Sequence, residues 1–246
     1  MIIFKFHVLF YIFSFICGIT GYFKNFLFFS LLIIIHECGH VFAAYIFKWK
    51  VDRVVILPIG GITIFDEFLS KSILEEFFIL LFGPLFQICF TYLFFYFFGF
   101  NELLYNYNLF LLFFNLLPIY PLDGYKFINL FFNLIFSYRL SFIFSIIFSF
   151  LFLLFSFLFI FFYYYNFILL IALFILLYRN IKYLFSFKLI FNKFLLERYL
   201  YNFYFNKIKY IDNIFNMKRT YLHIFKYRNK FINEKDYLKK YFKKNM

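Results

Sequence analysis

Two histidines and a glutamate stand in the otherwise apolar segment IIIHECGHVFAAYIF, residues 33–47. His36, Glu37 and His40 form the pattern H-E-x-x-H. On a helix, positions i and i+4 share one face, so both imidazoles can bind the same metal ion. Glu37 lies beside that face and can accept a proton from a water molecule at the metal. Zinc is the expected ion, because it takes imidazole nitrogen and carboxylate oxygen and keeps one position for water.

The alternative is that the histidines are structural and bond only to neighbouring backbone or side-chain groups. Charged side chains at the centre of a membrane segment cost about 2.5–3.5 kcal/mol each on insertion scales, and those that occur usually have a function. The apolar surroundings of the motif therefore favour a metal site.

A catalytic zinc ion usually has three protein ligands. The candidate for the third is Asp123, in NLLPIYPLDGYKF, residues 115–127. Pro118 and Pro121 must interrupt a helix just before it, and interrupted backbone at membrane depth needs protein or a water-filled cavity around it. With Gly124, the interruption and the carboxylate indicate a water-accessible pocket. The alternative, an interfacial aspartate that caps a turn, is weakened by the first motif.

The composition indicates a membrane protein. Hydrophobic residues make up 65% of the chain, and the mean hydropathy is +0.85. Apolar stretches near 20 residues recur, which is the length that crosses a hydrocarbon core of about 30 Å. We expect an all-α polytopic membrane protein with about six transmembrane helices and a short membrane-associated β-hairpin. The expected spans are residues 6–23, 27–47, 74–98, 107–134 (interrupted in its second half), 141–162 and 166–181.

Basic residues are concentrated near the C-terminus. Residues 179–246 hold 17 Lys and Arg against four acidic residues, so they carry the whole net charge of +13. Basic flanks remain on the cytoplasmic side of a membrane, which places both termini in the cytoplasm. The sequence thus predicts a six-span domain at residues 1–181 and a basic cytoplasmic tail at residues 182–246.

The hairpin is expected in VDRVVILPIGGITIF, residues 51–65, between the second and third spans. This segment is rich in β-branched residues, and Pro58, Gly60 and Gly61 are turn formers. An interfacial loop that only connects the spans fits the spacing equally well.

These motifs resemble the site-2 protease family of intramembrane zinc metalloproteases, and within it the sporulation branch. The resemblance extends over residues 1 to about 200, in the family's order and spacing. It is carried by HECGH, KWKVDRVVILPIGG, EEFFILLFGPLFQ, NLLPIYPLDG and FLLERY (residues 194–199).

The resemblance implies one zinc ion per chain, with His36, His40 and Asp123 as its ligands and Glu37 as the catalytic base. The segment 51–65 would correspond to the family's membrane-reentrant loop near the active site. The implied substrate-cleft residues are Asn115, Pro121 and Gly124.

Two departures from the family pattern stand out. The double glycine that follows the aspartate in the family reads Gly124–Tyr125 here, beside the expected site. The sporulation branch also carries a C-terminal nucleotide-sensing CBS domain, whereas only about 45 residues follow FLLERY in this sequence. We interpret residues 182–246 as including a shortened remnant of that domain, which leaves ATP binding open.

The expected reaction is hydrolysis of a peptide bond in or near a membrane segment of another protein. By resemblance, the substrate is a membrane-tethered precursor such as a pro-sigma factor, and inhibitory membrane proteins are further partners. The expected location is a bacterial inner membrane or the membrane around a forespore.

Other functions remain open at this stage. The chain could be a non-catalytic membrane scaffold that binds the same class of target, or a zinc transporter, although transport requires polar residues along a whole pathway. The tail could lie on the anionic inner leaflet of the lipid bilayer, bind a cytoplasmic part of the substrate, or remain solvated. Nucleic-acid binding has charge in its favour but no motif, and is not expected.

Overall fold

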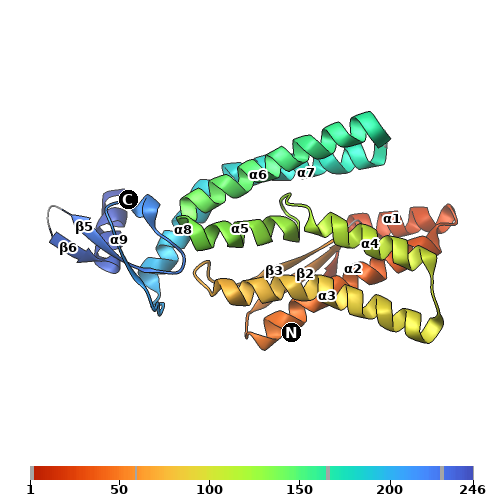
Figure 1. Ribbon diagram of the computed structural model, residues 1–246, viewed down its shortest axis with the longest axis horizontal. Coiled ribbons are helices and arrows are strands. Elements are labelled where there is room, and N and C mark those ends of the chain that lie inside the picture. The colour runs from red at the N-terminus through yellow and green to blue at the C-terminus, as the bar shows by residue number, and fades with distance from the viewer. Residues whose placement is uncertain (1–2, 59, 165–166, 228–229, 246) are drawn as a thin grey trace. The chain divides into compact units, whose positions relative to one another are not determined.

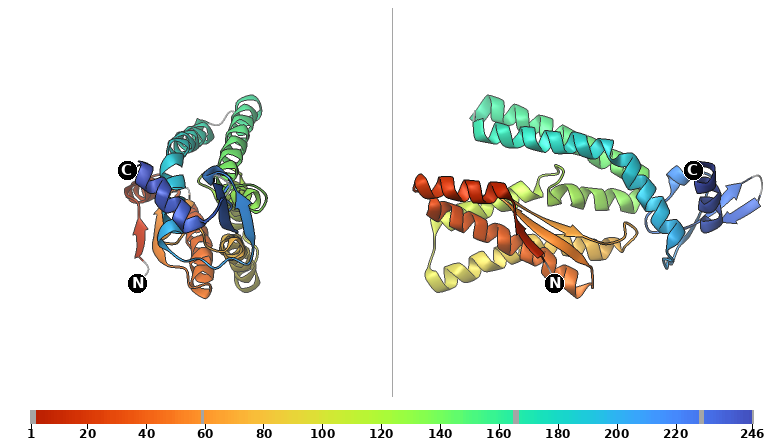
Figure 2. Two further views of the ribbon diagram at one scale, coloured as in Figure 1. Left: turned by 90° about the vertical axis from the view of Figure 1, so that its left-hand side faces the viewer. Right: turned by 180° about the vertical axis from the view of Figure 1, so that it is seen from behind.

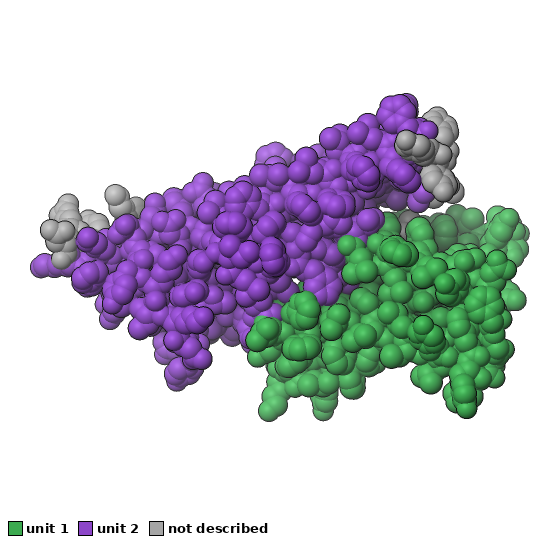
Figure 3. All heavy atoms as spheres, viewed as in Figure 1, with its two compact units in different colours: residues 1–67, 74–116 green, residues 68–73, 117–246 purple. Residues whose placement is uncertain are grey.

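The computed structural model describes residues 3–58, 60–164, 167–227 and 230–245. The chain divides into two compact units, Met1–Glu67 with Leu74–Leu116 and Phe68–Ile73 with Leu117–Met246 (Figure 3). Each unit has its own core of buried apolar side chains.

The first unit combines helices with a three-stranded sheet (Figures 1 and 2). Strand β2 pairs parallel with β1 and antiparallel with β3. Within the range predicted as a hairpin, 51–65, there are thus two antiparallel strands, and residue 59 between them lies outside the described residues. The pairing of β1 was not predicted. The elements are β1 (Ile3–Phe6), α1 (Val8–Ile19), α2 (Phe23–Ile46), β2 (Val51–Leu57), β3 (Gly60–Phe65), α3 (Ile73–Phe98) and α4 (Glu102–Leu116).

The core of the first unit joins α2 to the sheet and to α4. Val54 and Ile56 lie on one face of β2, because alternate residues of a strand point the same way. Both are fully buried, as are residues of α2 and α4 that pack with them. The helix that carries H-E-x-x-H is therefore fixed by packing on two sides. The members from α2 and α4 are Leu32, Ile33, Leu104 and Leu111.

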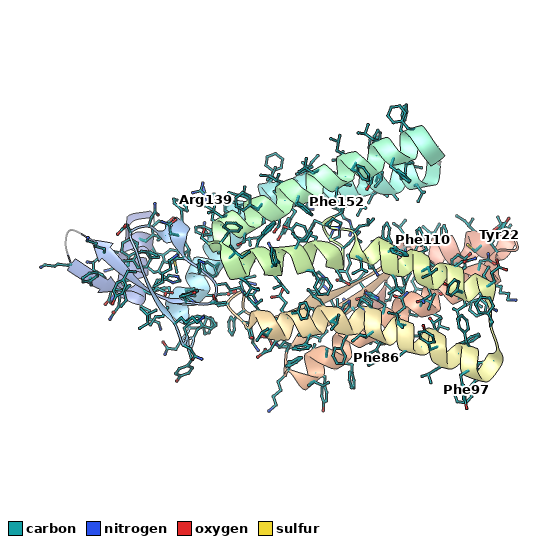
Figure 4. The ribbon with its side chains drawn as sticks, viewed as in Figure 1. Tyr22, Phe86, Phe97, Phe110, Arg139 and Phe152 are labelled. Carbon is teal, nitrogen blue, oxygen red and sulfur yellow. The ribbon has the colours of Figure 1, made fainter. Side chains whose placement is uncertain are left out.

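Several helices have the length and composition of membrane spans. Among the described residues, α2, α3 and the segment Tyr138–Phe162 qualify singly, and Leu169–Phe185 qualifies with Phe187–Leu200 as a pair bent by 50°. Aromatic side chains project outwards from such helices, as Phe97 of α3 does with 71% of its surface exposed (Figure 4). An integral membrane protein with three or four candidate spans follows from these helices.

The first predicted span, 6–23, is shorter in the structure. Helix α1 has 12 residues, which is about 18 Å of helix, less than the hydrocarbon core of about 30 Å. Phe6 belongs to β1 and pairs with β2. Gly21 ends the helical run with a φ of +79°, a conformation that glycine adopts without strain.

The second unit begins with two helices, α5 and α6, that pack together, and α7 packs along α6 (Figure 1). A second three-stranded sheet follows, in which β5 pairs parallel with β4 and antiparallel with β6. The elements are α5 (Asp123–Ile135), α6 (Tyr138–Phe159), a π-helix (Ile160–Tyr164), α7 (Phe167–Phe185), α8 (Phe187–Leu200), β4 (Ile208–Ile211), a 3-10 helix (Ile214–Asn216), β5 (Leu222–Tyr227), β6 (Lys230–Asn233) and α9 (Glu234–Asn245).

The C-terminal sheet and α9 fold onto α8. Phe194 and Leu195 of the FLLERY segment are fully buried with Phe225 and Leu238. Tyr138, at the start of α6, stacks on Phe194 with ring centroids 4.2 Å apart. The described part of the tail is therefore folded rather than a loose solvated segment.

A buried ion pair ties α8 to α9 beside this core. Nε and Nη2 of Arg198 donate to the Glu234 carboxylate at 2.6 and 2.8 Å. Nε2 of His223 accepts from the Lys218 N–H at 3.0 Å, so the proton of the neutral ring is on Nδ1, 3.1 Å from the Glu234 carboxylate. All three side chains that form this cluster are at most 5% exposed.

The two titratable groups of the cluster have shifted pKa values. Burial disfavours the charged imidazole and lowers the pKa of His223, although Glu234 opposes this shift, and Arg198 adds repulsion. Burial by itself would raise the pKa of Glu234, but the hydrogen bonds and charges of His223 and Arg198 outweigh it and lower the pKa.

We expect the tail to lose stability in acid. The pKa of His223 is near 6.5 in an unfolded chain and lower in the fold. Its contribution is therefore complete above about pH 6.5 and is lost as the pH falls towards the folded pKa. Glu234 adds a further loss below about pH 4.5, because its pKa is also lower in the fold than in the unfolded chain.

Hydrogen exchange of β5 amides in the full-length protein, corrected for the intrinsic rate, measures this loss. His223→Gln keeps an acceptor for the Lys218 N–H but cannot be protonated in this range. The variant should lack the loss of protection between about pH 6.5 and 5. If protection depended on pH in the same way in the variant and the unaltered protein, His223 would not be the group responsible for the loss of stability.

Candidate metal centre

His36, Glu37 and His40 lie in the interior of α2, and their exposed fractions are 1%, 4% and 3%. The two imidazole rings lie close together, with centroids 4.8 Å apart and an angle of 81° between their planes. The helical placement predicted from the i, i+4 spacing is therefore found in the structure.

Both imidazoles are oriented through Nδ1. Nδ1 of His40 lies 2.8 Å from the carbonyl oxygen of Ile79, and Nδ1 of His36 lies 3.0 Å from Oε1 of Gln87. The amide nitrogen of Gln87 donates to Asn108, at 2.8 Å to Oδ1 and 3.1 Å to the carbonyl oxygen, so Oε1 faces His36 as an acceptor. Each neutral ring therefore carries its proton on Nδ1 and presents a lone pair on Nε2.

This arrangement fits a zinc ion. The two Nε2 atoms are 3.2 Å apart, and two lone pairs at that distance repel each other unless a cation or proton lies beside them. Nitrogen ligands at about 2.0–2.1 Å from a tetrahedral zinc ion would be about 3.4 Å apart. Outer hydrogen bonds from Nδ1 to a carbonyl or an amide oxygen are typical of zinc-binding histidines.

Strand β3 holds the carboxylate of Glu37. The hydroxyl of Thr63 donates to Oε2 of Glu37 at 2.6 Å. Gly61, two residues earlier on the same face of the strand, leaves no room for a side chain, because a Cβ there would collide with Cγ of Glu37. The strand thus fixes the plane of the carboxylate.

Two glycines allow α2 and α3 to approach each other at the histidines. A Cβ on Gly83 would collide with the ring of His40, and a Cβ on Gly39 would collide with the carbonyl oxygen of Phe82. The close approach brings the Ile79 carbonyl within reach of His40.

Asn115 lies near the end of α4, with Nδ2 3.4 Å from Nε2 of His36. This contact is long for a hydrogen bond. The structure nevertheless places this predicted cleft residue beside the metal-binding face of α2, within the first unit.

The other predicted site residues belong to the second unit. Asp123 is the first residue of α5 and is 7% exposed. One carboxylate oxygen lies 2.9 Å from Nζ of Lys126. Gly124 follows within the helix, and Pro121 follows a cis peptide bond from Tyr120. Because His36 and Asp123 lie in different units, the role of Asp123 as the third ligand stays a prediction.

The sequence alone assigned no role in the site to Gln87, Asn108 or Thr63, and Gly61 was expected only as a turn former. Gln87 carried a signal, since an amide in an apolar membrane helix needs a partner within the protein. Thr63 and Gly61 carried none, because their roles depend on how β3 packs against α2.

An apolar helix with two oriented imidazoles and an adjacent, anchored carboxylate defines a membrane protein with a metallopeptidase type of site. Residues 24–102 match the sequence profile of Peptidase family M50. The chain is also similar to stage IV sporulation protein FB of Bacillus subtilis (strain 168), at 38% identity over 119 residues. That match covers 46% of this chain and 41% of the relative, so it spans less than half the length of either protein.

The fold is similar to that of the site-2 protease from Methanocaldococcus jannaschii, with a TM-score of 0.57 and 24% identity. The likeness covers 74% of this chain and 90% of the archaeal one. The resemblance to the site-2 protease family that was predicted from the sequence is thereby confirmed. The match to this peptidase family implies a metal, typically zinc.

We expect Gln87→Leu to weaken zinc binding by about 10–100-fold, because it removes the acceptor that orients His36. Chelator competition on the purified protein measures the affinity. Thr91→Val is the matched control: it is buried one turn further along the same helix, and its hydroxyl donates only to the Gln87 backbone carbonyl. An equal loss in both variants would show a general effect on α3 instead.

Proposed function

We propose that this chain is an intramembrane zinc metalloendopeptidase that hydrolyses a peptide bond in or near a membrane segment of a protein substrate. The observation that carries the proposal is the geometry of α2. Two buried imidazoles present Nε2 lone pairs 3.2 Å apart, and the carboxylate of Glu37 is anchored next to them.

We assign one zinc ion per chain to His36, His40 and Asp123. Bound there, it would act as a Lewis acid and lower the pKa of water. Asp123 suits the role of anionic ligand, because Lys126 and the N-terminus of α5 both stabilise its negative charge.

Glu37 is the proposed general base. Thr63 donates to Oε2, so we assign the other carboxylate oxygen, Oε1, to accept the proton of the attacking water. A base held in one orientation needs no rearrangement at the moment of proton transfer.

The substrate would bind in an extended form. β3 is an edge strand in the order β1-β2-β3, and a strand added to its open edge would form main-chain hydrogen bonds. Because β3 also contacts Glu37 through Thr63, this mode would bring an unwound peptide towards the base. We assign Asn115, Pro121 and Gly124 to the lining of the substrate cleft.

The finer proposal concerns the substrate and the cell. The proposed substrate is a membrane-tethered precursor such as a pro-sigma factor, and the proposed partners include inhibitory membrane proteins. The proposed location is a bacterial inner membrane or the membrane around a forespore. All three proposals rest on the resemblance to the sporulation branch. We also propose six membrane crossings within residues 1–181, with the short helix α1 as the first of them. Both termini would lie in the cytoplasm, and the basic tail at 182–246 would include a shortened CBS remnant.

Replacement of Glu37 by Gln should leave zinc bound and reduce cleavage by about 10²–10⁴-fold, because the amide cannot accept the proton. The assay co-produces the chain with a membrane-tethered sigma-factor precursor and follows the shorter product by immunoblot, with zinc content measured on the purified protein. Glu102→Gln, at an exposed position in the first turn of α4, is the control.

Undiminished cleavage by Glu37→Gln would refute the base assignment. If the unaltered, zinc-loaded chain bound the precursor but did not cleave it, the scaffold alternative would be favoured instead.

A further inference from the structure

The backbone just before Asp123 is irregular and lies between two apolar helices. Within this segment the Ile119 N–H donates to the Leu117 carbonyl and the Leu122 N–H to the Ile119 carbonyl, both at 2.8 Å. Tyr120 precedes Pro121, and a residue before proline is disfavoured in a helix. The N–H and C=O of Tyr120 therefore need partners from elsewhere, since lipid offers none.

Helices α6 and α7 supply those partners. The Tyr120 N–H donates to Oγ of Ser149 at 3.1 Å, and Nδ2 of Asn180 donates to the Tyr120 carbonyl at 2.8 Å. Ser149 in turn donates to Oδ1 of Asn180 at 2.6 Å. Both side chains are fully buried. The three hydrogen bonds close a ring around one residue of the loop, and we call Ser149 and Asn180 the Tyr120 clamp.

Helix α7 also holds the ring of Tyr120. Tyr183, one turn from Asn180, stacks on it with centroids 3.9 Å apart and planes 10° apart. Residues three apart share a face of a helix, so one face of α7 contacts both the backbone and the side chain of Tyr120.

The bonding of Ser149 differs from that of other serines on α6. The hydroxyls of Ser141 and Ser145 donate to carbonyl groups one turn earlier in the chain, which is the usual behaviour of serine in an apolar helix. Ser145 also accepts from Asn129 of α5, but it donates to no other helix among the described contacts. Ser149 donates across to α7 and accepts from the loop. A role in small-residue packing alone does not require this pattern.

We propose that Ser149 and Asn180 are positioning residues for Asp123, and this rests on the proposed function, in which Asp123 is the third metal ligand. The Leu122–Ile119 hydrogen bond closes a turn around Tyr120 and Pro121. α5 begins directly after that turn, with Asp123 as its first residue. The clamp holds this turn in place, and the turn determines the position of Asp123 at the start of α5.

The experiment measures metal binding by the full-length protein in detergent, with Zn²⁺ affinity from chelator competition and visible absorption of bound Co²⁺. Ser149→Ala and Asn180→Leu should each weaken Zn²⁺ binding by about 10–100-fold, as loss of supporting hydrogen bonds does at metal sites, and should alter the Co²⁺ spectrum. Ser149→Thr keeps the hydroxyl and should retain both properties. Ser141→Ala, at a fully buried position on α6, is the matched control and should leave both unchanged.

The same variants in an Asp123→Ala background separate positioning from a general loss of structure. If the clamp acts through Asp123, Asn180→Leu should cause no further loss of affinity there. Two results would overturn the proposal. The first is an equal further loss of Zn²⁺ affinity when Asn180→Leu is added to Asp123→Ala. The second is that the clamp variants behave like Ser141→Ala although Asp123→Ala alone weakens binding, and this result would leave the proposed function intact. Unchanged affinity in Asp123→Ala alone would overturn both.

Discussion

Polar groups inside apolar helices must find their hydrogen-bond partners within the protein, because lipid offers none. The metal-binding face of α2 follows from this constraint. His40 bonds to a carbonyl of α3, and His36 bonds to Gln87, which is itself held by Asn108 of α4. The same bonds that satisfy these groups also fix the tautomer and orientation of both rings. Stability and preparation for metal binding therefore have one physical origin here.

Spacing within one element was readable from the sequence. The i, i+4 histidines lie on one face of a helix, and the β-branched segment at 51–65 contains two antiparallel strands. Contacts between distant segments were not readable. The pairing of β1 with β2 and the contact of Thr63 with Glu37 join residues about 26 to 50 positions apart, and no local pattern specifies them. For the same reason, a span expected at 6–23 became a strand followed by a short helix.

Aromatic residues are so frequent in this chain that their individual roles could not be inferred from type alone. Tyr125 occupies the position where the resembled family has a second glycine. In the structure it is 2% exposed and lies edge-on to the rings of Tyr120 and Tyr183. The added bulk is thus accommodated by rings of the same unit.

Helix α6 contacts two different parts of its unit, one at its start and one three turns later. At its first residue, the ring of Tyr138 stacks on Phe194 and its N–H donates to the Met217 carbonyl, so the tail's core includes the helix start. Three turns further along, at about 16 Å of helix rise, Ser149 bonds to the loop before Asp123. Removal of the tail would expose the ring of Tyr138. It would also loosen the first turn of α6, the helix that supports this loop through Ser149. A purified fragment without the tail would therefore not keep the native structure of the membrane helices around this loop.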